Sequence, residues 1–318
     1  MEISSLIQAL SDGEFHSGSE LGALLGVSRT AIWKALDRLA EYGLEYESHR
    51  GKGYRLLRPL DLLDLQRITS ALPSRAQSLV DVHSVLSCGS TNASVHDCFR
   101  GSDARYVALL SEQQTAGRGR RGRSWCSPFA ENIYLSVLFD WYKGAAELQG
   151  LSIVAGVAVA ELLADEGVAS VGLKWPNDVW ISGKKVAGIL VELEGEVTSG
   201  WRVTLGLGLN THMSQASADD IDQPWTSVSE FVDLQRSEFA AKLIDRLVSS
   251  IEEFADMGFS SFISRYDMFD ALRGRSVDLH GPDVQGLVAG IDVNGALLLE
   301  IDSGVEAFHA GELSVRLA

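Results

Sequence analysis

The chain has 318 residues, enough for two or three domains, and 46% of them are hydrophobic, which suffices for a buried core. Its net charge of −16 excludes non-specific binding of the whole protein to nucleic acid, so any DNA contact needs a locally basic patch. Cys88, Cys98 and Cys126 form no CxxC pair, which indicates a reducing, cytoplasmic compartment. No basic and apolar leader opens the chain, and the longest apolar run, residues 151–163, is too short to cross a bilayer, so we expect no membrane partner.

The first 60 residues predict a winged helix-turn-helix domain, with a boundary after residue 60. A capping box that begins at Ser17 opens a second short helix, and Ser28 is a good N-cap for a third one. Strand-like residues around a glycine-rich turn, within 44–57, predict the hairpin of the wing. Between Ser28 and Arg58, seven Lys or Arg residues oppose four acids, which gives the basic patch that DNA binding requires. A small helical protein-interaction domain is the alternative.

The outward face of the third helix and the tip of the wing supply the candidate DNA contacts. They are Ser28, Arg29, Thr30, Trp33, Lys34 and Lys52. Trp33 is bulkier than the small polar residues that usually read bases, so the operator sequence stays open.

The rest of the chain predicts two further domains, a mixed α/β domain over residues 61–270 and a small β domain over residues 271–318. In the first, a strongly apolar strand at 133–139 precedes a largely buried helix at 148–166. In the second, short β runs are separated by Gly-Pro and Asn-Gly turns, which is typical of a small closed β module. The expected fold class is therefore α+β.

Residues 114–125 have an unusual composition. Four arginines and three glycines fall within 117–123 of an acidic protein, which suggests that an anion is held there. A P-loop would need lysine in place of Arg123 and a helix directly after it, but a poor helix start follows. A solvated nucleic-acid-binding tail is disfavoured because apolar, strand-like runs flank the stretch. We favour a mobile loop that closes over an anionic small molecule.

Two other segments offer ligand contacts. Residues 87–92 place small hydroxyl and amide side chains at the end of a strand, although these residues could also cap the next helix. Along residues 201–210, bulky side chains alternate with small ones, so that Gly206 and Gly208 leave one face of a strand nearly bare. Glycine in a strand often marks a place where a ligand touches the backbone, and a tight bend is the alternative.

Five motifs, in this order and spacing, resemble those of the biotin–protein ligases of the bifunctional repressor type. The motifs are Ser90-Thr91-Asn92, residues 114–123, Lys174-Trp175-Pro176-Asn177-Asp178, residues 185–192 and Gly206-Leu207-Gly208-Leu209-Asn210. The resemblance covers essentially the whole chain. It implies an N-terminal winged helix-turn-helix domain, a central ligase domain with a mixed sheet, and a C-terminal SH3-like β-barrel.

The resemblance also implies a reaction in two steps. Biotin and ATP, with Mg²⁺, form biotinyl-5′-adenylate and pyrophosphate. A lysine of a carrier protein, such as the biotin carboxyl carrier protein of acetyl-CoA carboxylase, then receives the biotinyl group. In repressor-type members, the adenylate promotes homodimerisation, and the dimer binds operator DNA and represses biotin synthesis.

Site residues follow from the resemblance position by position. The catalytic residues that it implies are Lys185, Arg118 and Arg120, which would neutralise two anionic reactants, and Asp178, which would help to hold Mg²⁺. The biotin contacts are Ser90, Thr91, Asn92, Gln114, Arg118, Gly119, Arg120, Lys185, Gly188, Gly206 and Gly208. The nucleotide contacts are Arg121, Arg123, Trp125, Lys174, Asn177, Asn210 and Trp225, the last of them stacked on adenine. Asn177 and Asp178 are the nearest match to ligands for the Mg²⁺ of ATP.

Two other functions compete with this one. A regulator that senses biotin without transferring it is disfavoured by Lys185, Asp178 and the intact arginine stretch. A lipoate or octanoate transferase on a related fold is disfavoured by the Gly-Arg stretch and by residues 174–178, and the winged domain adds weight to the ligase.

Overall fold

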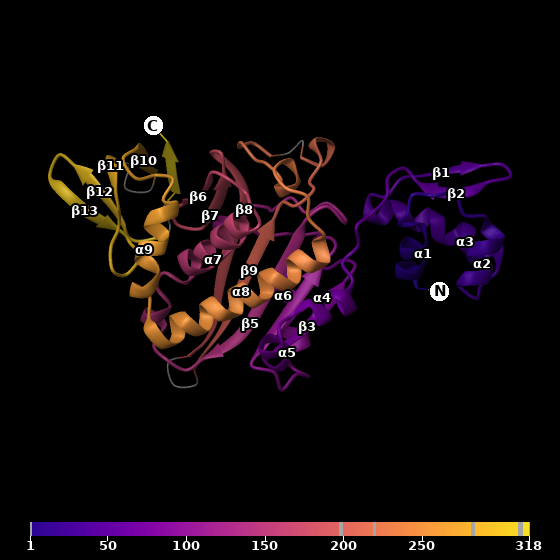
Figure 1. Ribbon diagram of the computed structural model, residues 1–318, viewed down its shortest axis with the longest axis horizontal. Helices are drawn as coiled ribbons and strands as arrows, with labels where there is room; N and C mark the ends of the chain where they lie inside the picture. Colours follow the sequence, from indigo (N-terminus) through magenta and orange to yellow (C-terminus); the bar gives the residue numbers. More distant parts are fainter. Residues whose placement is uncertain (1, 197–199, 219–220, 281–283, 311–313, 318) are drawn as a thin grey trace.

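Figure 1 shows the protein as a computed structural model with three parts along its long axis. The structure describes residues 2–196, 200–218, 221–280, 284–310 and 314–317. A helical domain with a small hairpin lies at one end, the C-terminal strands lie at the other, and a large sheet with its helices lies between them.

The N-terminal part is the winged helix-turn-helix domain that the sequence predicts. Its elements are α1 (Ile3–Leu10), α2 (Gly18–Leu24), α3 (Arg29–Leu36), the 3-10 segment η1 (Asp37–Tyr42), β1 (Tyr46–His49) and β2 (Gly53–Leu56). Ser17 opens α2 with the expected capping box, and Ser28 caps α3 by accepting the Ala31 amide at 3.2 Å. Buried side chains of α1, α3 and the wing form a small core that also takes in Phe129 and Ala130 of the central domain.

A seven-stranded mixed sheet forms the centre of the molecule. Its strands, in spatial order, are β3 (Val80–Val85), β4 (Tyr106–Ser111), β5 (Ile133–Trp141), β9 (Gly200–Leu209), β8 (Lys184–Glu196), β7 (Asp178–Ile181) and β6 (Val171–Lys174). β3 and β4 are parallel, and the other neighbouring pairs are antiparallel. The predicted apolar strand and the predicted alternating strand are confirmed as β5 and β9, which pair with each other.

Helices cover the two faces of this sheet unequally. One face packs on α7 (Leu151–Asp165) and α8 (Arg236–Met257), with α4 (Leu65–Ala71), α5 (Ser74–Leu79) and α9 (Ser260–Phe269) beside them. The other face carries α6 (Thr91–Phe99). Within β4, Ala108 and Leu110 join the large core, whereas Val107 packs with Val95 of α6. This alternation is the period-2 pattern of a sheet that is covered on both sides.

Helix α7 is the buried helix that the sequence predicts. With the 3-10 segment η3 (Ala145–Leu148), the region Ala145–Asp165 is long and apolar enough to cross a membrane by length and composition. In the structure, 67% of its most apolar window is buried inside the protein, beside the sheet and α8 (Figure 1). Such burial is what the core helix of a globular domain shows.

The C-terminal part is a five-stranded antiparallel sheet, as expected for the SH3-like module. Its order is β13 (Gly304–Phe308), β12 (Leu297–Ile301), β11 (Val284–Ile291), β10 (Ser276–His280) and β14 (Ser314–Leu317). The turn before β12 contains Gly295, whose φ of 80° favours glycine. The Gly295 carbonyl accepts the Trp175 indole N–H at 3.0 Å, which joins this module to the central domain.

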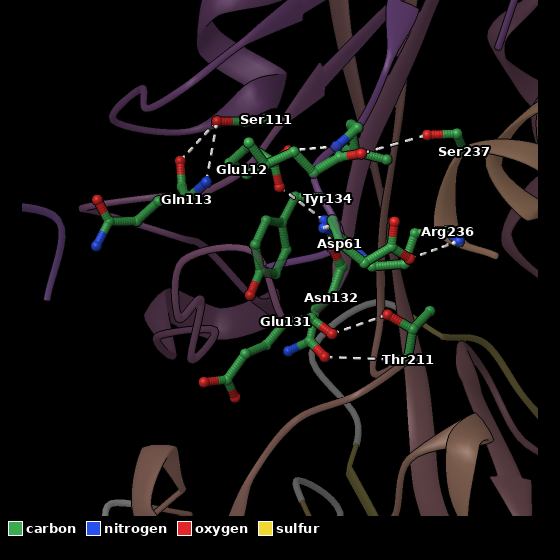
Figure 2. A network of polar contacts seen from close by, with 12 residues as sticks. Asp61, Ser111, Glu112, Gln113, Glu131, Asn132, Tyr134, Thr211, Arg236 and Ser237 are labelled. Carbon is green, nitrogen blue, oxygen red and sulfur yellow. Dashed lines mark hydrogen bonds and ion pairs between the residues drawn. The ribbon is translucent and has the colours of Figure 1, made fainter. Parts of the chain in front are cut away.

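A buried polar network joins the N-terminal linker to the central domain (Figure 2). Arg236, at the start of α8 and completely buried, donates to Glu112 Oε2 at 2.8 Å and to the Asn132 carbonyl at 2.7 Å. It also donates to the Asp61 carbonyl of the linker. Glu112 and Asn132 lie at opposite ends of the loop between β4 and β5. One buried guanidinium therefore fixes both ends of that loop to the linker.

Candidate active site

A cavity lies on the α6 side of the sheet, between the N-terminus of α6, the β4–β5 loop, and strands β7, β8 and β9. The predicted site residues that line it are Ser90, Thr91, Asn92, Gln114, Arg118, Gly119, Arg120, Arg121, Arg123, Trp125, Lys174, Asn177, Asp178, Lys185, Gly188, Gly206 and Gly208. All five motifs therefore meet at one place, although they are spread over more than a third of the chain.

One end of the cavity is cationic. Its Lys and Arg side chains are Arg120, Arg121, Arg123, Lys174 and Lys185, and Asp178 is the single carboxylate among the described lining residues. Arg118 lies towards the other end, where its Nη2 is 3.2 Å from Glu192 Oε2. Lys185 Nζ lies 2.7 Å from Asp178 Oδ1, and the two side chains are 15% and 14% exposed. Burial lowers the pKa of Lys174 and of Arg120, and the charge of Asp178 opposes the shift in both. An end with this charge suits a polyanion.

The loop that carries the arginines forms a compact hairpin. Arg118 and Ser124 form an isolated antiparallel bridge, and the Gly119 amide donates to the Arg123 carbonyl at 2.7 Å. At the tip, in the 3-10 segment η2 (Arg120–Gly122), Arg121 has a φ of 59°. Strand β5, not a helix, is the next regular element, so the P-loop interpretation is wrong. The mobility of the loop stays a prediction.

Arg120 links this loop to two other parts of the molecule. Its Nη1 donates to Asn177 Oδ1 at 3.3 Å, and its Nη2 donates to the Ala310 carbonyl of the C-terminal module. The loop is therefore held across the cavity by contacts with the motif at 174–178 and with the module beyond it.

The opposite end of the cavity is polar and hydrogen-bonded within itself. Gln114 Oε1 accepts the Thr91 amide at 2.9 Å and so caps the start of α6. Asn92 is 4% exposed; its Oδ1 accepts the Ser136 hydroxyl at 2.6 Å, and its Nδ2 donates to Glu192 Oε2 at 2.7 Å. Because both halves of the Asn92 amide are paired with protein atoms, Asn92 shapes this end of the cavity.

The glycines of the bare strand face make room for protein side chains. A Cβ at Gly206 would lie 2.2 Å from Asn92 Oδ1, and a Cβ at Gly208 would lie 2.3 Å from the Trp125 indole. Gly188 is similarly close to Trp125, at 2.9 Å. The sheet is thus less open than the sequence suggested, and contact between these glycines and a ligand stays a prediction. Trp125 Nε1 is buried beside Gly208 and, within the described residues, lacks a hydrogen-bond partner.

Asn210 and Trp225 are not among the described residues that line the cavity. Asn210 is 3% exposed, and its Nδ2 donates to the Thr226 carbonyl at 3.2 Å. Trp225 pairs with Lys185 in an isolated parallel bridge. Both residues therefore hold the segment beside Lys185, and their contact with a nucleotide stays a prediction.

Some residues at the site were missed from the sequence. Gln223 and Val315 line the cavity, and Ser136 and Glu192 hold Asn92. Ser136 is the one small polar residue in the apolar run at 133–139, which could have marked it. Val315 comes from the C-terminal module, and no sequence pattern connects it with the site.

Asp178 alone is a suitable metal ligand at the site. Among the described ranges, no group of three or more His, Cys, Asp or Glu could hold a metal ion. Asn177 uses both sides of its amide, because its Oδ1 accepts Arg120 and its Nδ2 donates to the Ile189 carbonyl at 2.8 Å. This donor set fits an ion that phosphates mainly hold, and it does not support Asn177 as a ligand.

The candidate DNA contacts lie on the surface of the N-terminal domain. Ser28, Arg29, Thr30, Trp33 and Lys34 are exposed along α3, and Lys52 is exposed in the turn of the wing. Trp33 is 54% exposed, whereas Ile32 and Leu36 are buried. The placement suits a recognition helix, and the contact of each residue with DNA stays a prediction.

Comparison with known proteins shows the family. Residues 92–210 match the Biotin/lipoate A/B protein ligase family, residues 3–55 an HTH domain, and residues 274–316 the Biotin protein ligase C terminal domain. The bifunctional ligase/repressor BirA of Salmonella typhimurium is 41% identical over 99% of this chain and 97% of its own length. That of Escherichia coli is 38% identical over 98% and 97%. The chain belongs to the bifunctional biotin ligase/repressor family.

Solved structures agree with this assignment. The biotin protein ligase of Aquifex aeolicus, in complex with biotin and ATP, matches with a TM-score of 0.64 and 27% identity. The match covers 75% of this chain and 99% of that one. The enzyme is a biotin–protein ligase that also carries a repressor's DNA-binding domain, and biotin and ATP are its ligands. The alternatives, a non-catalytic sensor and a lipoate or octanoate transferase, gain no support.

Proposed function

We propose that this cavity joins biotin to ATP and then passes the biotinyl group to a lysine of a biotin carboxyl carrier protein. The observation that carries the proposal is the two-ended cavity, polar and hydrogen-bonded around Asn92 and cationic around Lys185 and Asp178. Biotin's ring would lie at the polar end, and its carboxylate would point to the cationic end, where the triphosphate binds.

In the first step, a biotin carboxylate oxygen bonds to the α-phosphorus of ATP, and the bond from that phosphorus to the bridging oxygen breaks to release pyrophosphate. Two anions must approach each other, so charge neutralisation is the main requirement. Lys185 and Arg120, which line the cavity, would supply this charge, and Arg118 would do so by leaving Glu192, 3.2 Å away. In the second step, the acceptor amine attacks the acyl carbon and AMP leaves.

The individual contacts keep the assignments made from the sequence, except at Asn92, whose amide is paired with protein atoms. Ser90, Thr91 and Gln114 would contact biotin, and Asn92 would act by positioning them. Lys174, Arg121 and Arg123 would contact the phosphates, with Trp125 as a wall. Trp225 would reach adenine only if its segment moves, since it does not line the cavity. The domain limits that we propose are 1–60, 61–270 and 271–318.

Magnesium would enter with ATP. When bound, it would offset the negative charge of the phosphates. In this chain the carboxylate of Asp178 would hold it, next to the phosphate-facing Lys185.

We also propose that the adenylate promotes homodimerisation and that the dimer binds operator DNA through α3 and the wing. The exposed polar and basic residues of α3 support this, together with the local excess of positive charge in an acidic chain. Repression of biotin synthesis would follow when adenylate accumulates.

Labelled biotin, Mg-ATP and an apo carrier domain test the ligase. We expect label on the carrier lysine and none with lipoate. Adenylate that forms but is never transferred would favour the sensor hypothesis instead. Label on the carrier from lipoate alone would favour a lipoate ligase. For the repressor, selection from a random pool of duplexes should enrich one sequence only when adenylate is present.

A further inference from the structure

The loop that carries the arginines is tied at its far end to the DNA-binding domain. Glu131, two residues before β5, is 1% exposed, and its Oε1 lies 2.5 Å from Nη2 of Arg58. Arg58 follows the wing strand β2 by two residues and is 47% exposed. Phe129 packs edge-on against Tyr42 of the N-terminal domain, with ring centroids 5.4 Å apart. Residues 129–131 therefore form part of the contact between the two domains.

Glu131 also holds residues 211–217, on the other side of the same loop. Its Oε2 accepts the Ser214 amide at 2.8 Å, and its Oε1 accepts the Ser217 hydroxyl at 2.9 Å. Its carbonyl accepts the His212 amide at 2.8 Å. Among the described residues, the carboxylate thus has three donors, of which only Arg58 brings a full positive charge.

Further along the chain, the same connection between β9 and α8 reaches the cavity. Gln223 lines the cationic end. The Pro224 carbonyl accepts the Lys185 amide at 3.0 Å, and the Lys185 carbonyl accepts the Thr226 amide at 2.9 Å. The beginning of the connection between β9 and α8 is therefore anchored to Glu131, and its end is anchored to Lys185.

We propose that Glu131 is a positioning residue for the nucleotide end of the cavity and couples that end to the DNA-binding domain through Arg58. The inference rests on the proposed function, because it assumes that the adenylate fills this cavity. A carboxylate buried this deeply needs a countercharge. Without Arg58 the Glu131 carboxylate keeps only the two neutral donors from Ser214 and Ser217, so its position against residues 211–217 is less firmly fixed.

The coupling must act in both directions. If an intact Arg58–Glu131 pair favours the arrangement that binds adenylate, then bound adenylate strengthens the pair and steadies the DNA-binding domain by the same factor. A purely structural role for Glu131 would lower stability without linking the two affinities.

The test compares the full-length wild-type chain with Arg58→Gln, Glu131→Gln and the double variant. Arg67→Gln is the matched control, since it removes the same charge from an exposed pair with Asp64 near the start of α4. Calorimetry gives the affinities for biotin and for a non-hydrolysable biotinyl-adenylate analogue. Titration of the duplex selected by the wild-type chain, with and without the analogue, gives the factor by which the analogue strengthens DNA binding.

We expect Arg58→Gln to weaken analogue binding about fivefold, as befits a half-exposed partner, with biotin binding unchanged. The factor by which the analogue strengthens DNA binding should fall by the same amount. The double variant should bind the analogue no more weakly than Glu131→Gln does. Arg58→Lys should restore part of the lost affinity. Unchanged analogue affinity and enhancement in Arg58→Gln, or additive losses in the double variant, would overturn the proposal. If Glu131→Gln does not fold, Arg58→Gln and Arg58→Lys decide alone. A wild-type chain that does not bind the analogue would instead refute the proposed function.

Discussion

Replacing Gly206 by alanine tests whether Asn92 shapes the biotin end of the cavity. Gly206 lies in the extended strand β9, so its backbone accepts alanine. The added methyl would lie 2.2 Å from Asn92 Oδ1, about 1 Å nearer than van der Waals contact allows. Neither the strand nor the first turn of α6 can move easily, so the Asn92 side chain must give way.

The cost follows from what Asn92 would lose. Its amide is 4% exposed and bonded to Ser136 at 2.6 Å and to Glu192 at 2.7 Å. Each buried group left unpaired costs about 1–3 kcal/mol, so we expect a loss of about 2–4 kcal/mol in the free energy of unfolding. A displaced Asn92 also no longer shapes the biotin end through Ser136 and Glu192, and a comparable penalty there would weaken biotin binding about 10- to 100-fold.

Denaturant unfolding and calorimetric titration with biotin measure the two effects. Gly89→Ala is the control, because a Cβ at this neighbour of Ser90 meets nothing within 4 Å. Adding Asn92→Ala to Gly206→Ala removes the clash and should recover part of the stability but not the biotin affinity. Unchanged stability and biotin binding in Gly206→Ala, or full recovery of biotin binding in the double variant, would refute this reasoning.

Three further predictions use other contacts. Lys185→Ala should slow adenylation about 100-fold or more in a pyrophosphate-release assay. Lys184→Ala, at an exposed neighbour, should leave the rate unchanged. Equal adenylation rates in the two variants would remove Lys185 from the mechanism. Burial lowers the pKa of His212, so the unfolded chain binds a proton at this imidazole more readily than the folded chain does, and stability falls as the pH drops below 6.5. His212→Gln should flatten this part of a stability–pH profile, and an unchanged profile would contradict the prediction. Lys34→Ala should reduce the slope of log affinity for DNA against log salt concentration by about one, and an unchanged slope would exclude a phosphate contact.

Much of the fold could be predicted because its signals are local. The capping residues Ser17 and Ser28, the apolar run at 133–139 and the alternation at 201–210 each determine an element from neighbouring residues. That the five motifs lie together came from the family resemblance, not from periodicity, and the cavity agrees with it.

Contacts between residues that lie far apart in the chain could not be predicted from the sequence. Nothing near Gly206 shows that Asn92 will fill the space beside it, because the two residues meet only when α6 packs on β9. The ion pair of Arg58 with Glu131 joins residues 73 positions apart. Such pairs depend on tertiary packing, which propensity and spacing do not record.

The C-terminal strands do more than close the chain. Val315 of β14 lines the cavity, and the Ala310 carbonyl accepts a hydrogen bond from Arg120. A shortened version of the enzyme that ends after α9 would therefore lose part of the lining of the cavity and one of the hydrogen bonds that hold the arginine loop. Anyone trimming this ligase to a minimal biotinylation tool should keep the last strand.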